Sequence, residues 1–167
     1  MYQMRTDNDC GPAAISAASG LPYERIMEAW PYGFAGNASD SPWHHDAVMA
    51  ALGVRRRVAT CGEILSGECP PDRTVILVHD WDKSGGDALT DQHWVVLAPG
   101  APVGQVYLHM GDGKVRWYTH DQFRRLYAAS APACAYVVGE GEVPTLSWYQ
   151  RAWLWLSATR IAKKVLG

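Results

Sequence analysis

The sequence predicts an α+β domain in which a helical first third packs on an antiparallel sheet. Helix start and stop signals fill the first part of the chain, and apolar runs separated by turn signals fill the second. With 167 residues, of which 48% are hydrophobic and 19% charged, the chain is about the size of one globular domain. Its net charge of -2, without an acidic or basic block, gives no reason to expect nucleic acid as a partner.

Three helices are predicted in the first part of the chain. Asp9 is a residue type that caps helices, Pro12 fits the first turn because no N–H is needed there, and Gly20 ends the helix. Further helices are predicted at residues 22–30 and 42–52. The segment PYGFAGNASDSP between them is rich in turn residues and predicts a loop.

The second part of the chain is predicted to form the sheet. TVILVHD is a continuous apolar run that suits a central strand, and HWVVLAP is a second buried strand. QVYLHM and KVRWYT form a predicted hairpin around Gly111-Asp112-Gly113, since Asp-Gly is a strong signal for a two-residue turn. The other predicted elements are an edge strand in VRRRVAT, a short turn or helix in GEILSG, a helix in HDQFRRLYAAS and a last strand in ACAYVVGE.

A separate C-terminal segment follows the Gly- and Pro-containing joint GEGEVPT. Residues 1–140 are therefore predicted to form the domain, and residues 141–167 a linker and a Trp-rich helix. The apolar residues of SWYQRAWLWLSATRIAKKVLG cover too much of the circumference for a helix surrounded by water. We expect residues 147–167 to dock, and three destinations stay open: the core of this domain, a protein partner, or a membrane surface.

The four cysteines show neither a C-x-x-C pair nor a spacing typical of a zinc site. Free thiols are favoured over a Cys61–Cys69 disulfide loop, because no secretory signal precedes them. No run reaches the ~18 apolar residues that a membrane span needs. The expected location is the cytoplasm or a particle that is assembled inside a cell.

Cys10 is the candidate nucleophile, because the N-terminus of a helix is one place where the pKa of a thiol is lowered. Thiol catalysis also needs an imidazole base, a group that orients this base, and donors for an oxyanion. His93 begins the buried run HWVVL, Asp112 lies in the turn after the following strand, and Gln3 precedes the cysteine by seven residues. Each residue alone has an ordinary structural explanation, but together they can fill all the roles of a thiol hydrolase.

These motifs resemble the papain-like thiol peptidases of the C39, or bacteriocin-processing, type and their C39-like relatives. In that family a Gln precedes a D-C-G-x-A-A helix start, a later H-[FWY]-V-V-L strand supplies the base, and a carboxylate from the next hairpin completes the set. This chain has DCGPAA and HWVVL. The resemblance implies the following roles: Cys10 as nucleophile, His93 as general base, Gln3 as oxyanion donor and Asp112 as orienting acid.

Two positions depart from the family pattern. Gln3 lies about one residue farther from the cysteine than usual. The family's Asp directly follows the strand, with Pro after it, whereas this strand ends in His109-Met110-Gly111-Asp112. The acid is thus displaced by about two positions. If Asp112 does not reach the imidazole, then water, a backbone carbonyl or nothing orients His93.

The resemblance implies a thiol hydrolase that cleaves a peptide or amide bond through a thioacyl-enzyme and needs no cofactor. It implies peptide substrates, typically cleaved after a Gly-Gly pair, while amidase, isopeptidase and toxin-like activities stay open. The alternative is a catalytically weak or inactive module of a larger assembly, such as a phage particle, that docks through its C-terminal helix. A metal site at His44-His45 is not expected, because adjacent helix residues point about 100° apart.

Overall fold

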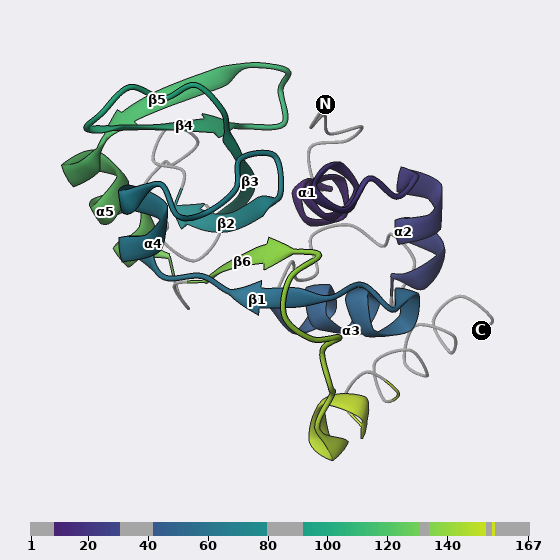
Figure 1. Cartoon of the computed structure of the whole chain (residues 1–167). Helices are drawn as coiled ribbons and strands as arrows, with labels where there is room; N and C mark the ends of the chain where they lie inside the picture. The colour runs from purple at the N-terminus through teal and green to yellow at the C-terminus, as the bar shows by residue number, and fades with distance from the viewer. Residues whose placement is uncertain (1–8, 31–41, 80–91, 131–133, 153–154, 156–167) are drawn as a thin grey trace.

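A six-stranded antiparallel sheet forms the centre of the computed structural model, with helices on both of its faces (Figure 1). The structure describes residues 9–30, 42–79, 92–130, 134–152 and 155. Neighbouring strands follow the order β1-β6-β2-β3-β4-β5. The predicted α+β class is confirmed, because helices come first and the antiparallel sheet second. The strands are β1 (Arg56–Val58), β2 (Thr74–His79), β3 (Gln92–Ala98), β4 (Gln105–His109), β5 (Val115–Thr119) and β6 (Ala135–Val138).

The strands β2 and β3 lie in the middle of the sheet, and β1 lies at an edge, as predicted. The continuous apolar run of β2 is explained by helices that cover both faces. Ile76 and Val78 belong to a buried cluster on one face, whereas Val75 and Leu77 belong to a cluster on the other. Successive side chains of a strand point to opposite faces, so every residue of such a run is buried.

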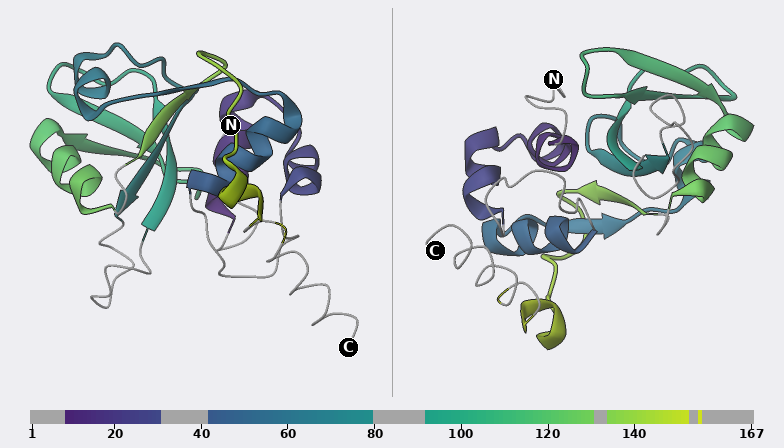
Figure 2. Two further views of the ribbon diagram at one scale, coloured as in Figure 1. Left: turned by 90° about the horizontal axis from the view of Figure 1, so that it is seen from below. Right: turned by 180° about the vertical axis from the view of Figure 1, so that it is seen from behind.

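The helices form one layer on each face of the sheet (Figure 2). On the first face, α1 (Cys10–Ser19) and α3 (Pro42–Leu52) pack on the sheet, and α2 (Tyr23–Ala29) packs against both of them. On the second face lie α4 (Cys61–Ser66) and α5 (His120–Ala129), whose Phe123 is fully buried. Cys10, the first residue of α1, therefore belongs to the layer on the first face.

The start of α1 differs in one respect from the prediction. Asp9 holds the N-cap position, but its carboxylate makes no capping hydrogen bond to the helix. The Tyr23 hydroxyl donates to Oδ2 of Asp9 at 2.8 Å instead. The carboxylate thus links the start of α1 to the start of α2. Gly20 ends α1 with a φ of 72°, a backbone conformation that glycine adopts without strain.

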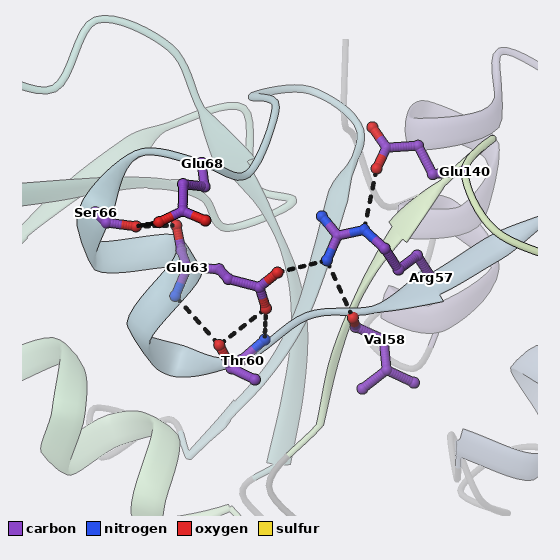
Figure 3. Close-up of polar contacts among 7 residues, drawn as sticks. All are labelled: Arg57, Val58, Thr60, Glu63, Ser66, Glu68 and Glu140. Carbon is purple, nitrogen blue, oxygen red and sulfur yellow. Dashed lines mark hydrogen bonds and ion pairs between the residues drawn. The ribbon is translucent and has the colours of Figure 1, made fainter.

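A polar network ties α4 to the edge strand β1 (Figure 3). Thr60 and Glu63 form a capping box, in which the Glu63 carboxylate accepts from the Thr60 N–H at 2.7 Å. This hydrogen bond is the largest cause that lowers the pKa of Glu63. Arg57 of β1 pairs with Glu63 at 2.6 Å and with Glu140, beyond β6, at 3.1 Å. The start of α4 and the chain after β6 are thereby joined to β1.

The β4–β5 hairpin is confirmed, but its turn is not the predicted two-residue Asp-Gly turn. The Met110 N–H donates to the Lys114 carbonyl at 3.3 Å, and Gly111, Asp112 and Gly113 form the loop between them. Both glycines have positive φ, 82° and 78°. The loop thus consists of the three residues around which the hairpin was predicted, and its two positive-φ positions are both occupied by glycine.

The chain beyond residue 140 stays attached to the domain. Arg56 of β1 donates its N–H to the Glu142 carbonyl at 2.9 Å and accepts from the Glu142 N–H at 3.3 Å. Farther on, the Tyr149 ring lies 6.2 Å from the ring of Trp43, so the last described helix starts beside α3 (Figure 1). The predicted boundary at residue 140 stays a prediction. No helix among the described residues combines the length and apolar character needed to cross a membrane.

Candidate active site

Cys10 is the first residue of α1 and is 6% exposed. The helix packs on β3 and β2, and Cys10 belongs to the same buried cluster as Val75, Trp94 and Val96. Pro12 lies in the first turn, as predicted, because its missing N–H would have no partner within the helix. The partial positive charge of a helix N-terminus therefore lies at the position of the thiol.

His93 follows Gln92, the first residue of β3, and its backbone is held by pairing with Val78 of β2. The side chain is 5% exposed, and its Nε2 lies 2.8 Å from the Met110 carbonyl oxygen. A carbonyl can only accept, so Nε2 carries the proton in this hydrogen bond. In the neutral ring Nδ1 is then the basic nitrogen, as a general base requires.

The packing of Trp94 brings the cysteine helix to the histidine strand. Trp94 directly follows His93 and is fully buried in the cluster that contains Cys10. Two segments that lie 83 positions apart in the sequence, at Cys10 and at His93, are thus packed against each other. The pairing of the Cys10 thiol with the His93 imidazole stays a prediction.

Asp112 points into its own hairpin. Its Oδ1 accepts from the Lys114 N–H at 2.9 Å, and its Oδ2 lies 3.9 Å from the Arg116 guanidinium. The Met110 carbonyl, directly after β4, accepts from His93 instead. Met110 holds the place where the family pattern has its acid, two residues before Asp112. The orienting role of Asp112 stays a prediction. Gln3 lies outside the described residues, and its role stays a prediction as well.

A buried cluster of aromatic and histidine side chains lies between α3 and the strands β3 and β6, and it was not predicted from the sequence. His45 of α3 is fully buried and forms a hydrogen bond through Nδ1 to the Tyr136 hydroxyl. Its ring also packs against the tilted ring of Trp94, with ring centroids 4.0 Å apart. His44 stacks on Trp30 at 6.1 Å. The sequence signal was a pair of histidines in a helix whose remaining residues, Asp46 apart, are apolar.

Burial keeps both of these imidazoles neutral. It lowers the pKa of His44 to about 4. It also lowers the pKa of His45 well below 6.5, with the charges of His44 and Arg56 adding to the effect. Within the described ranges, no three His, Cys, Asp or Glu side chains are grouped as metal ligands. The two histidines therefore act as packed core residues.

The fold is that of a papain-like, C39-like peptidase domain. Helices come first in the chain, and an antiparallel sheet follows. A solved structure with this fold is the peptidase domain of Streptococcus ComA, a bi-functional ABC transporter involved in a quorum-sensing pathway. It matches with a TM-score of 0.59 and 16% identity, over 84% of this chain and 100% of that domain. No family model and no curated protein matches the sequence. At this identity the similarity establishes the fold alone.

Proposed function

We propose that this protein is a thiol hydrolase that cleaves a peptide or amide bond at Cys10. The observation that carries the proposal is the hydrogen bond from His93 Nε2 to the Met110 carbonyl, because it leaves Nδ1 as the basic ring nitrogen. The position of Cys10 at the start of α1, which packs on the strand that carries His93, supports the pairing of the two residues. The peptidase fold is consistent with peptide substrates.

The proposed reaction has two acyl-transfer steps. His93 Nδ1 takes the proton of the Cys10 thiol, and the thiolate adds to the substrate carbonyl carbon. The backbone N–H of Cys10 and the Gln3 side-chain amide stabilise the oxyanion. The His93 imidazolium then protonates the leaving amine as the carbon–nitrogen bond breaks, which yields a thioester. Water, deprotonated by His93, attacks the thioester and releases the acid and the free thiol.

The Met110 carbonyl would orient His93 in this scheme without supplying a full negative charge. A buried carboxylate both orients an imidazole and stabilises the imidazolium, whereas a neutral carbonyl stabilises it less. We therefore expect a weaker thiolate–imidazolium pair than in an enzyme with a complete Cys-His-Asp set. Asp112→Asn should change the reactivity of Cys10 by less than about threefold, and His93→Ala should lower it by about 100-fold or more.

Alkylation by iodoacetamide, mapped by mass spectrometry, tests the proposal without knowledge of the substrate. The other three cysteines serve as internal controls, because burial raises the pKa of Cys61 and Cys69 and raises that of Cys134 to about 11. Near pH 7, Cys10 should react at least about tenfold faster than any of them. If Cys10 reacts no faster than Cys61, or if His93→Ala leaves its rate unchanged, the hydrolase proposal is wrong.

The same experiment separates the two possible orienting groups. If Asp112→Asn lowers the alkylation rate as much as His93→Ala does, the carboxylate orients the imidazole and the Met110 carbonyl does not. If only His93→Ala lowers it, the carbonyl is sufficient.

A second candidate function is an interaction module that has lost thiol chemistry. It is favoured by the exposed rings of Trp148, Tyr149 and Trp155 near the end of the chain, which the hydrolase mechanism does not use. A protein in which Cys10 fails to react, but which still assembles through residues 147–167, would support this second function over the first.

A further inference from the structure

An exposed group of aromatic side chains lies where the C-terminal segment meets α3. We call it the aromatic surface: Trp43 is 42% exposed, Tyr149 52%, Trp155 66% and Trp148 79%. The rings of Trp43 and Tyr149 lie 6.2 Å apart, and those of Tyr149 and Trp148 lie 6.1 Å apart. Three of the four rings thus form one continuous patch that joins two elements.

The helical residues 148–152 and 155 present tryptophan to solvent on one face. Trp148 and Trp155 are both exposed and are seven residues apart, which is the spacing of nearly two full turns of an α-helix. Arg151 and Ala152 lie between them and are also exposed. Arg151 donates its Nε to the Leu146 carbonyl at 3.0 Å, which places its guanidinium beside the first turn. The solvent-facing stripe therefore combines two indole rings with a cation.

The sequence around this stripe is basic, although the chain as a whole has a net charge of -2. Residues 143–167 contain four basic residues and neither Asp nor Glu. Indole and phenol rings have an apolar body and a polar N–H or O–H, and they favour the boundary between lipid and water. Exposed indole rings beside a basic side chain such as Arg151 complement the negative surface of an anionic bilayer.

We propose that the aromatic surface binds the headgroup region of an anionic lipid bilayer. Trp148 and Trp155 enter the interface, and Arg151 contacts lipid phosphates. The segment would lie along the bilayer surface. The proposal does not depend on the thiol chemistry of Cys10, since the surface and the site lie on different parts of the chain.

Sedimentation of the full chain with sucrose-loaded vesicles tests this binding. One set of vesicles contains phosphatidylcholine and phosphatidylglycerol at about three to one, and the other contains phosphatidylcholine alone. We expect at least about tenfold tighter binding to the anionic set, and a marked loss at high salt. Replacing both Trp148 and Trp155 by serine should weaken binding about tenfold or more, and Arg151→Glu about fivefold or more.

The matched control is Trp117→Ser, which removes another exposed tryptophan. Trp117 is 60% exposed on β5, at the opposite edge of the sheet from β1 (Figure 1). Its replacement should leave vesicle binding unchanged. The proposal is overturned if anionic vesicles do not bind the chain, or if Trp117→Ser weakens binding as much as the double variant does. It is also overturned if Trp148 and Trp155 instead mediate self-association in solution without any vesicle binding.

Discussion

Acidification should destabilise this protein, because two buried histidines must take up protons when the chain unfolds. His44 is fully buried against Trp30, and its pKa falls from 6.5 to about 4. Between these two values the unfolded chain binds a proton at His44 and the folded chain does not. The free energy of unfolding therefore falls as the pH falls through this window, and the stabilisation is fully present above pH 6.5.

The size of the effect follows from the pKa difference. A pKa change from 6.5 to about 4 contributes about 3 kcal/mol to the free energy of unfolding near neutral pH. Most of this contribution is lost by about pH 4.5. His45 acts in the same direction, because burial lowers its pKa as well. Since folded domains are stable by only about 5–15 kcal/mol, this loss should be easy to measure.

Urea denaturation, followed by circular dichroism at about pH 7.5, 6.5, 5.5 and 4.5, measures this loss. Replacing His44 by glutamine should flatten the pH dependence, because the ring that takes up a proton on unfolding is then absent. If the glutamine variant of His44 does not fold, an NMR titration of the wild-type ring provides the same information. A free energy of unfolding that changes by less than about 1 kcal/mol, or a His44 ring that titrates near pH 6.5, would refute the reasoning.

Two further stability predictions rest on contacts between distant parts of the chain. Tyr136→Phe removes the hydroxyl bonded to His45 Nδ1, and Nε2 of that ring already lacks a hydrogen-bond partner within the described part of the chain. The expected cost is about 1–3 kcal/mol by urea denaturation, and an unchanged midpoint would show that the hydrogen bond contributes nothing. Gly141→Ala would place its Cβ 2.5 Å from the Arg56 carbonyl oxygen, whereas Gly53 has nearly the same φ and open space around it. Gly141→Ala should therefore destabilise the protein by about 1 kcal/mol or more beyond Gly53→Ala, and equal effects would contradict the close approach to β1.

Most of the elements could be predicted because their signals are local. An apolar run with a turn at each end, or a proline in a first turn, acts through neighbouring residues, and so β2, β3, α1 and α5 were placed correctly. The errors concern details that depend on partners. Asp9 was expected to cap α1 with its side chain, but the nearby Tyr23 hydroxyl contacts its carboxylate instead.

In the candidate site, too, some features follow from local sequence and others depend on tertiary contacts. The sequence by itself determined Cys10 at a helix start and His93 at the start of a buried strand, because DCGPAA and HWVVL are short continuous motifs. Only the tertiary structure decided which group accepts the hydrogen bond from the His93 imidazole. The Met110 carbonyl has that position because β4 lies beside β3, and a backbone carbonyl leaves no mark in the sequence, since every residue has one.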